Sequence, residues 1–484
     1  MPNFNITQHY KLWTLVSFLL FSLIAKGQQP NIIYILTDDL GYGDVSAYNS
    51  KSKIATPWID ALAKEGMRFT DAHSNSSVCT PTRYGILTGQ YAWRTSLKNG
   101  VLWSYDKPLI SPDQLTVAQL LKNKGYQTAC VGKWHLGLDW AKQPNGAIDF
   151  TKPINGGPTQ LGFDYFFGIT ASLDIPPYVY INDNIVTATR IDSIQEQVGQ
   201  GFWRAGPIGN DFKHQDVLDS FVSKSIQYIE KASKQKDPFF LYLALASPHT
   251  PILPSNAQTG KTATNAYGDF VAMTDEKVGQ IIQYLKDKNL DKNTMIVFTS
   301  DNGCSPSANF KELREKGHDP SSGFRGTKAD IYEGGHRIPF IVKWPGVVKA
   351  NSISSATICL TDFMATCSDI LGKPLQNTAT QDSYSLLPLL TSSKKINYQR
   401  TSTIHHSIDG YFAIRKGDWK LAICSGSGGW SVPTENQAIK NNLPAIQLYN
   451  LKEDPTEQNN VHNKYPEIVR ALTAELEKIK ANKK

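Results

Sequence analysis

The chain has 484 residues, of which 40% are hydrophobic and 19% are charged. This composition is that of a globular protein with one large core and room for a smaller lobe, and it argues against a disordered chain. The formal net charge of +7 is spread over many lysines without a concentrated basic stripe, so we expect tolerance of anionic substrates and no nucleic-acid partner.

The N-terminus has the features of a secretory signal peptide. Lys11 precedes an apolar run over residues 12–25, and a polar stretch at 26–29 follows it. We therefore expect a signal peptide over residues 1–27 and a protein exported to the periplasm or the medium. A signal anchor is the alternative, but the apolar run is short for a membrane span and no second span follows. No stable membrane insertion is expected.

Beyond the N-terminus, strand-like apolar runs alternate with helical patterns. In chain order they predict a strand at 31–37, a helix at 57–69, a loop entering a helix at Cys79, a helix at 115–126, a strand at 128–131, a helix at 216–232, a strand at 239–246, a helix at 267–290 and a strand at 294–299. This alternation predicts an α/β fold with a large, mostly parallel sheet covered by helices on both faces. Such sheets bind ligands at the carboxyl ends of their strands, where polar residues follow each run.

Two regions break the alternation. Residues 144–210 are rich in Gly, Pro, Asn and aromatic residues, and we expect them to form a rim or lid. After about residue 377 we expect strands within 411–423 and at 448–451, then an amphipathic helix at 466–480, as a smaller lobe with an antiparallel sheet. The predicted division is a signal peptide over 1–27, a catalytic domain over 28–376 and a C-terminal subdomain over 377–484.

The chemistry of the chain centres on Cys79. Small polar residues lead into it, Pro81 stands where a first helical turn accepts proline, and an apolar face begins at Tyr84. The sulfur is therefore expected at a helix N-terminus, where backbone N–H groups and the helix dipole favour an anion. Arg83, one turn further on, can reach back to the same point. The alternative is a buried or disulfide-bonded cysteine before an ordinary helix.

The stretch Cys79-Thr80-Pro81-Thr82-Arg83, followed by Leu87-Thr88-Gly89, resembles the signature of the type I sulfatases. The resemblance implies an alkaline-phosphatase-like fold and a formylglycine nucleophile, which a maturation enzyme makes by oxidising Cys79. A serine that attacked a sulfate ester would be left as a stable ester. A hydrated aldehyde has a second hydroxyl, whose deprotonation expels sulfate and restores the aldehyde.

Three carboxylates and an amide follow two of the predicted strands. Asp38 and Asp39 end the first strand, and Asp301 and Asn302 end a later one. Hard oxygen ligands of this kind suit calcium or magnesium and not zinc, although adjacent aspartates also occur in ordinary turns. The resemblance implies a calcium ion that these four residues hold together with the formylglycine oxygen at position 79, and that polarises a sulfate oxygen.

The resemblance also assigns the remaining catalytic roles. Lys133 and His135 lie in the sequence Gly-Lys-Trp-His-Leu-Gly. Lys133 is expected to contact the sulfate, and His135 is expected to act as base for the hydrate. His249 is expected to protonate the leaving alkoxide, and Lys328 to contact the sulfate oxygens. The other possibility for the first pair is a solvated lysine and a core histidine.

Further residues are weaker candidates. Arg325 and His336 are close enough in sequence to Lys328 to contribute, whereas the pairs His405-His406 and His318-Asp319 are interpreted as exposed loop residues. One or two aromatic residues are expected to stack on a sugar ring. The candidates are Trp103, Tyr105, Trp140, Tyr178, Tyr180 and Trp203. Most of the six cysteines are expected to be buried small apolar residues, because no Cys-x-x-Cys motif occurs.

Together these residues predict an exported sulfatase that hydrolyses sulfate monoesters of a sulfated oligo- or polysaccharide. The sequence around residues 78–139 also resembles bacterial sulfatases that act on 6-O-sulfated galactose or N-acetylgalactosamine. Two alternatives remain open. One is a phosphonate or phosphodiester hydrolase of the same superfamily, and the other is a non-catalytic glycan-binding protein that keeps Cys79 as a thiol.

Overall fold

The computed structural model describes residues 29–372, 381–391, 398 and 400–482. The predicted signal peptide, residues 1–27, and the predicted domain boundary at 376–377 lie outside the described residues. Across the described ranges, no helix combines the length and the apolar character needed to cross a bilayer.

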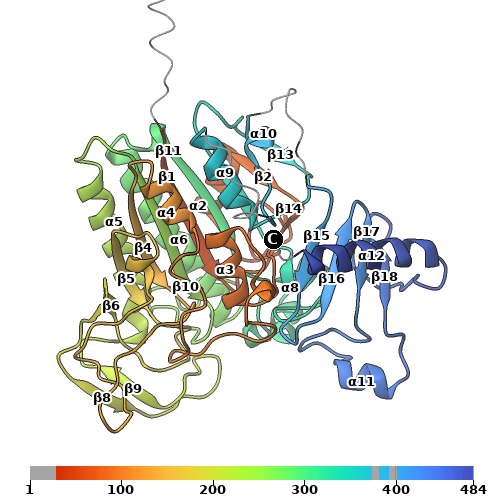
Figure 1. Cartoon of the computed structure of the whole chain (residues 1–484), viewed down its shortest axis with the longest axis horizontal. Helices are drawn as coiled ribbons and strands as arrows, with labels where there is room; N and C mark the ends of the chain where they lie inside the picture. Colours follow the sequence, from red (N-terminus) through yellow and green to blue (C-terminus); the bar gives the residue numbers. More distant parts are fainter. Residues whose placement is uncertain (1–28, 373–380, 392–397, 399, 483–484) are drawn as a thin grey trace, which may run out of the picture.

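The body of the molecule is built on one large sheet (Figure 1). Within the described residues it has ten strands in the order β13-β2-β12-β11-β1-β10-β4-β5-β6-β7. Their bounds are β1 Asn31–Asp38, β2 Met67–Phe69, β4 Gln127–Lys133, β5 Tyr165–Ile169, β6 Ile181–Asn182, β7 Ile185–Val186, β10 Phe239–Pro248, β11 Thr294–Ser300, β12 Phe340–Lys343 and β13 Ser352–Ser354. The central run β11-β1-β10-β4-β5 is parallel, which confirms the predicted mostly parallel sheet.

Strand β1 shows why its sequence is a continuous apolar run. Ile32, Tyr34 and Leu36 belong to the core on one face of the sheet, and Ile33 and Ile35 belong to the core on the other. Successive side chains of a strand point to opposite faces, so a strand covered on both sides has no position for a polar residue. Polar residues appear only where the strand ends.

Helices cover both faces of the sheet, as Figure 1 shows. Helices α2 (Pro57–Glu65), α5 (Val217–Ala232) and α6 (Ala266–Asp287) pack on one face. Helices α3 (Cys79–Thr88), α4 (Val117–Lys122), α9 (Asp362–Ile370) and α10 (Leu387–Leu390) pack on the other. The large size and two-sided cover of the sheet agree with the predicted α/β class.

Two predicted helices are shorter in the structure. The helix predicted at 57–69 ends at Glu65, because Gly66 adopts an extended conformation and the chain continues into β2 beside β12. The helix predicted at 115–126 is the six-residue α4, which Thr116 caps by accepting a hydrogen bond from the backbone of Gln119. At the first of these places, pairing of β2 with the distant strand β12 overrides the local helical pattern.

The irregular segment 144–210 contains more sheet than its sequence indicates. Strand β5 joins the main sheet beside β4, and β6 and β7 extend the sheet beyond it. A separate pair, β8 (Ile191–Ile194) and β9 (Gly206–Gly209), lies at the lower left of Figure 1. The prediction of irregular chain over this segment is therefore wrong for β5, which pairs with β4 as a regular parallel strand.

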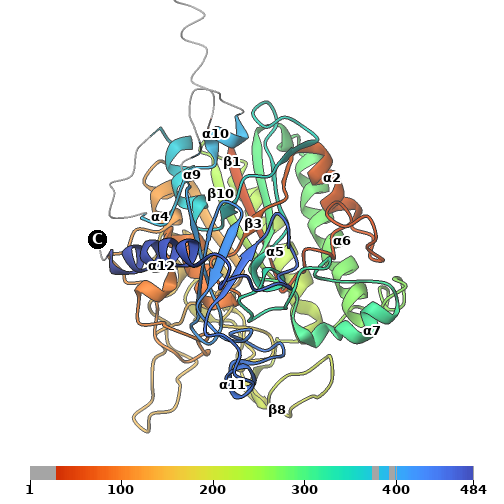
Figure 2. The same ribbon diagram turned by 90° about the vertical axis from the view of Figure 1, so that its right-hand side faces the viewer.

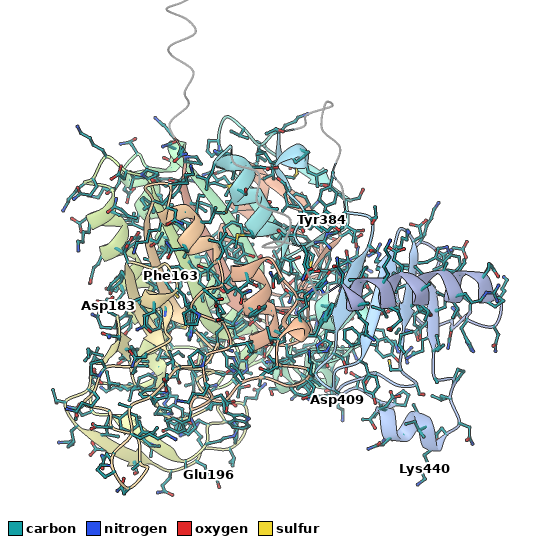
Figure 3. All side chains as sticks on the ribbon, in the orientation of Figure 1. Phe163, Asp183, Glu196, Tyr384, Asp409 and Lys440 are labelled. Carbon is teal, nitrogen blue, oxygen red and sulfur yellow. The ribbon has the colours of Figure 1, made fainter. Side chains whose placement is uncertain are left out.

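The C-terminal lobe carries a four-stranded antiparallel sheet in the order β15-β16-β17-β18, facing the viewer in Figure 2. Its strands are β15 Thr403–His406, β16 Phe412–Lys416, β17 Trp419–Ala422 and β18 Gln447–Asn450, and its helices are α11 Glu435–Lys440 and α12 Pro466–Ala481. The predicted hairpin, short strand and final helix are confirmed, and β15 was not predicted. Lys440, labelled in Figure 3, lies at the lower side of the lobe, at the end of α11.

Short elements complete the described chain. They are β3 Ala72–His73, β14 Ile358–Cys359, α7 Phe310–Glu315, α8 Glu333–His336 and the 3-10 turns η1 Ala92–Arg94, η2 Pro158–Gln160, η3 His214–Asp216, η4 Asp291–Asn293 and η5 Pro306–Ala308. β3 lies between β2 and the loop before Cys79, and α8 precedes β12. His73 of β3 and His336 of α8 are in contact, with their Nδ1 atoms 3.0 Å apart.

Candidate active site

The residues predicted to carry chemistry meet at the carboxyl ends of the central parallel strands. Asp38 is the last residue of β1, Lys133 is the last of β4, His249 follows β10, and Asp301 follows β11. Cys79, the first residue of α3, faces the same group, with its Sγ 3.7 Å from Asp38 Oδ1. Parallel register places these ends side by side, which is why residues more than 200 positions apart touch.

Cys79 stands at a buried helix start. Val78 before it is extended, and every residue of α3 is buried. Burial is the main cause that raises the pKa of the Cys79 thiol to about 12, although Lys133 and Lys328 act to lower it. An unmodified thiol here stays protonated at neutral pH and is a weak nucleophile.

The loop before Cys79 is held by the C-terminal lobe. The backbone N–H of Ser77 donates to the carbonyl of His406 over 3.0 Å, and the Ser76 hydroxyl donates to the same carbonyl over 2.9 Å. On the other side the N–H of Ala329, next to Lys328, donates to the Ser77 carbonyl over 2.8 Å. Strand β15, which the sequence did not predict, therefore helps to position the nucleophile loop.

The four predicted metal ligands form one cluster of oxygen atoms. The Asn302 amide donates to Asp39 Oδ1 over 2.7 Å, while Asn302 Oδ1 is buried and has no hydrogen-bond partner. Burial and the neighbouring Asp38 carboxylate raise the pKa of Asp301 to about 6. Crowded carboxylates beside an unpartnered amide oxygen fit a hard divalent cation. Such an ion would offset the repulsion between the carboxylates and would give the amide oxygen a partner.

Cationic side chains separate these carboxylates. Arg83 donates to Asp301 Oδ2 over 2.8 Å and to the Lys133 carbonyl over 2.9 Å. Lys133 Nζ lies 2.6 Å from Asp38 Oδ2, and Lys328 Nζ lies 2.8 Å from Asp39 Oδ2. Burial alone would raise the pKa of Asp38, but Lys133, His249 and Arg83 hold it well below its usual range. The site is thus preorganised for an anion.

His135 has one nitrogen committed and one free. Its Nε2 lies 2.8 Å from the carbonyl of Leu102, which can only accept, so Nε2 carries the proton. Nδ1 is buried and has no partner among the described residues. Burial, and then Lys133 and Arg83, lower the pKa of His135 well below its usual value. The ring is therefore neutral and offers Nδ1 as a proton acceptor.

His249 is the most open of the set. Its side chain is 11% exposed, whereas those of Asp38 and Lys133 are 0% exposed. Its Nδ1 lies 2.6 Å from the Thr250 carbonyl, and its Nε2 lies 3.7 Å from Asp39 Oδ2. A histidine at the mouth, with Nε2 directed at the carboxylate cluster, is placed to donate a proton to a group that leaves toward solvent.

Three residues at or next to the site have left-handed backbones. The φ angles are 66° at Asp39, 59° at His135 and 81° at Ala329, beside Lys328. Residues other than glycine adopt this region at a cost, and such strain gathers where function fixes a side-chain direction. No sequence pattern marks these positions, since none of the three is glycine.

The weaker candidates lie elsewhere. Arg325 donates to the Tyr449 hydroxyl and to the Glu457 carbonyl in the C-terminal lobe, away from the cluster. His336 packs against His405, with ring centroids 3.8 Å apart. His318 Nε2 lies 2.8 Å from Asp44 Oδ1.

The interpretation of the histidine pairs as exposed is wrong. His405, His406 and His318 are all buried. Strand β15 places His405 and His406 between the body and the lobe, where both are buried. The six cysteines are buried and free, as expected for small apolar residues.

The structure divides the six aromatic candidates. Trp140, Tyr178, Tyr180 and Trp203 are buried in the cores, whereas Trp103 is 51% exposed and Tyr105 is 43% exposed. Only the last two present a face to a ligand. Sequence position alone did not separate them, because burial depends on what packs against each ring.

Comparisons with known proteins agree with this geometry. Residues 30–373 match the sulfatase family, and residues 326–482 match the C-terminal region of the N-sulphoglucosamine sulphohydrolase family. A protein of Bacteroides thetaiotaomicron described as N-acetylgalactosamine-6-O-sulfatase is 35% identical, with 94% of each chain covered. Human arylsulfatase A is 30% identical, with 93% of this chain and 87% of the relative covered.

Solved structures give the same result. One from Bacteroides thetaiotaomicron, described in connection with the metabolism of multiple glycosaminoglycans, superposes with a TM-score of 0.83 at 34% identity and covers 94% of this chain and 100% of the other. A sulfatase from Pseudoalteromonas sp. shares the fold, with a TM-score of 0.71 at 23% identity and coverage of 97% and 94%.

Proposed function

The chain belongs to the sulfatase family, and from this premise we propose that it removes 6-O-sulfate groups from galactose or N-acetylgalactosamine in a sulfated glycan. Hydrolysis of sulfate esters on glycans is the activity that family membership gives. The finer substrate is supported by the 35% identity to a protein described as N-acetylgalactosamine-6-O-sulfatase. The proposed mechanism rests on one observation. Cys79 lies beside carboxylates, lysines and histidines at the same edge of the sheet.

The nucleophile is the formylglycine made from Cys79 by a maturation enzyme. Its hydrate supplies two hydroxyls, one to attack sulfur and one whose deprotonation releases sulfate. The helix start at Cys79 and the buried lysines Lys133 and Lys328 hold the anionic sulfate group. Arg83 keeps Asp301 and the β4 backbone in place beside them.

Asp38, Asp39, Asp301, Asn302 and the oxygen at position 79 would hold the calcium ion. The ion, when bound, polarises one oxygen of the sulfate group. Calcium is favoured over zinc because every side chain here, the formylglycine at position 79 included, offers oxygen.

The two histidines have opposite tasks. His135 takes a proton from the hydrate at Nδ1, because its Nε2 is committed to the Leu102 carbonyl. His249 delivers a proton to the departing sugar oxygen, because it is the more exposed and stands at the mouth of the site. Because base and acid are separate side chains, one can take a proton from the hydrate while the other gives one to the sugar oxygen.

We also propose that the protein is exported. The support is the signal-peptide pattern at residues 1–27, and a sulfated glycan is a substrate found outside the cytoplasm. Mass spectrometry of the mature protein from a periplasmic or culture fraction tests this, and an intact Met1 would contradict it.

The test of function is sulfate release from purified sugar sulfates. The protein is produced with a formylglycine-generating enzyme, and mass spectrometry verifies the aldehyde. We expect release from 6-O-sulfated N-acetylgalactosamine and none from the Cys79→Ala variant. Faster turnover of a phosphate diester or phosphonate would assign the chain to that chemistry instead. Binding of the glycan without release, by protein that carries the aldehyde, would leave only the glycan-binding alternative.

A further inference from the structure

An exposed tryptophan directly follows the residue whose carbonyl contacts His135. The N–H of Leu102 donates to the Thr80 hydroxyl over 3.2 Å, and the Leu102 carbonyl accepts from His135 Nε2 over 2.8 Å. The next residue is Trp103, which is 51% exposed. The loop is therefore fixed to the residue after Cys79 and to the base, and it presents an aromatic face at the edge of the site.

A second loop reaches the same place from strand β5. The N–H of His135 donates to the Thr170 carbonyl over 2.9 Å, and the Thr170 hydroxyl donates to the Ser104 hydroxyl over 3.0 Å. Four residues after Thr170 comes Asp174, which is 9% exposed. Its Oδ2 lies 2.5 Å from an Arg204 nitrogen, whereas its Oδ1 is buried and has no hydrogen-bond partner among the described residues.

Arg204 joins the tryptophan to this carboxylate. Its guanidinium lies 5.1 Å from the centre of the Trp103 ring, and its side chain is 40% exposed. The same segment borders the loop of His249, since the N–H of Ile252 donates to the Gln200 carbonyl over 2.9 Å. Figure 3 marks this segment with Glu196 at the lower edge of the molecule. Residues 200–204 thus run along the rim from the proton donor to the exposed ring.

We propose that Trp103, Asp174 and Arg204 form the subsite that holds the sugar ring bearing the sulfate. The inference rests on the proposed function and names the part of the site that selects the sugar. Tryptophan offers a flat apolar face, the free carboxylate oxygen accepts from a hydroxyl, and the guanidinium donates to one.

The sugar hydroxyl that donates a hydrogen bond to the Asp174 carboxylate in this subsite is O4. In a 6-sulfated hexose O4 is the ring hydroxyl nearest C6, and it is the centre at which galactose and glucose configurations differ. With O4 axial, one face of the ring from C3 to C6 is apolar and suits an aromatic partner. A buried acceptor without a donor is unfavourable, and a site built to pair it with a hydroxyl rejects sugars that misplace that hydroxyl.

The test compares a sugar substrate with one that has no ring hydroxyls. Asp174→Asn places an NH2 group where a carboxylate oxygen accepted, and we expect kcat/KM on 6-O-sulfated N-acetylgalactosamine to fall at least tenfold, mainly through KM. The preference over 6-O-sulfated N-acetylglucosamine should collapse toward one. Turnover of 4-nitrophenyl sulfate and inhibition by inorganic sulfate should change less than threefold, because neither uses the subsite.

Two further variants separate stacking from folding. Trp103→Ala should raise KM for the sugar at least fivefold, and Trp103→Phe should restore most of the loss. Asp192→Asn is the matched control. Asp192 pairs with Arg190 on β8 as Asp174 pairs with Arg204, but its side chain is 47% exposed and far more solvated. This control should leave every constant unchanged.

The outcomes keep the subsite and the proposed function apart. If the natural enzyme prefers another sugar sulfate, the substrate proposal fails, and the same variants are measured on the preferred sugar. A selective loss on that sugar still supports the subsite. Three results would overturn the subsite. Asp174→Asn could lose activity equally on sugar and aryl substrates, or it could lose none on either. The natural enzyme could also cleave aryl sulfates but no sugar sulfates.

Discussion

At the scale of single residues, the site separates two histidines that have the same side chain. His135 is buried, has a lowered pKa and offers Nδ1, whereas His249 is partly exposed and directs Nε2 at Asp39. The proposed roles of His135 as base and His249 as acid therefore rest on burial and on which ring nitrogen faces a carbonyl oxygen.

We predict that replacing each histidine has a different dependence on the leaving group. His249→Ala should slow sugar sulfate hydrolysis by about 10² to 10⁴-fold, and much less for 4-nitrophenyl sulfate, whose phenolate leaves without a proton. His135→Ala should slow both, because it acts on the nucleophile residue. Steady-state kinetics with both substrates give the comparison. A His249→Ala variant that loses the same factor on each substrate would contradict the assignment of the acid.

The oxygen cluster predicts a metal-dependent stability. Removal of calcium should leave Asp38, Asp39 and Asp301 crowded, with only Lys133, Lys328 and Arg83 to offset their charge. Chelation should therefore lower both activity and the melting temperature, and added calcium should restore them. Asn302→Leu should weaken calcium binding, since it removes the unpartnered amide oxygen. Thermal melts against calcium concentration measure this. An unchanged midpoint for the natural protein would argue against a resident ion.

At the scale of elements, strand β4 positions both Lys133 and His135. Gly132 precedes them with φ of 121°, and a Cβ there would lie 1.8 Å from the Ala244 carbonyl of β10. The strand reaches its partner closely only because this residue has no side chain. The direction of the two proposed catalytic side chains therefore depends on a residue that has no side chain of its own.

We predict that Gly132→Ala lowers the free energy of unfolding by more than about 2 kcal/mol and reduces kcat/KM about 100-fold, because β4 must move away from β10. Gly125→Ala is the matched control. Gly125 also has a positive φ, of 86°, but nothing lies within 4 Å of an added Cβ. It should lose only about 1 kcal/mol and keep full activity. Urea unfolding and kinetics on both variants measure this, and similar losses would refute the close-approach argument.

At the scale of the whole molecule, a buried network joins the catalytic body to the C-terminal lobe. Lys420 of β17 lies 3.0 Å from Glu333 and 2.9 Å from His336 Nε2, and His336 Nδ1 lies 3.0 Å from His73 Nδ1. His405 of β15 stacks on His336, and neither of its nitrogens has a partner among the described residues. The network lies between the nucleophile loop and the lobe.

The charged groups of this network set its pH dependence. Burial, despite the neighbouring carboxylates, lowers the pKa of His73, His336 and His405. Facing them are Asp71, Glu333, Glu457, Lys420, Arg415 and Arg337. Below about pH 6.5 these histidines bind protons in the unfolded chain but stay neutral in the folded protein. The free energy of unfolding therefore falls as the pH falls. Glu457, whose pKa burial raises to about 7, acts in the opposite direction.

We predict that His405→Phe makes the stability of the protein less sensitive to acid. The variant keeps a ring to stack on His336 but removes one group that binds protons only when unfolded. The slope of unfolding free energy between pH 7 and 5 should decrease by up to about 1.4 kcal/mol per pH unit. Denaturant unfolding at several pH values gives the slope. An identical slope for variant and natural protein would show that His405 does not titrate on unfolding.

The sequence by itself determined the parts of this protein that depend on local pattern. The alternation of buried strands and helices, the hairpin of the C-terminal lobe and the Cys79 motif are short-range features, and each was predicted from neighbouring residues. Polar residues directly after apolar runs marked Asp38, Lys133, His249 and Asp301, because parallel strands end at a common edge.

Only the tertiary structure decided which of these groups touch and in what state. The tautomer of His135 depends on the Leu102 carbonyl, and the pairing of Asp174 with Arg204 beside Trp103 joins three separate loops. Packing between β15 and the body buried histidines that looked exposed in sequence. These contacts join residues far apart in the chain, and their burial and charge are set by what the fold brings together, so no local pattern encodes them.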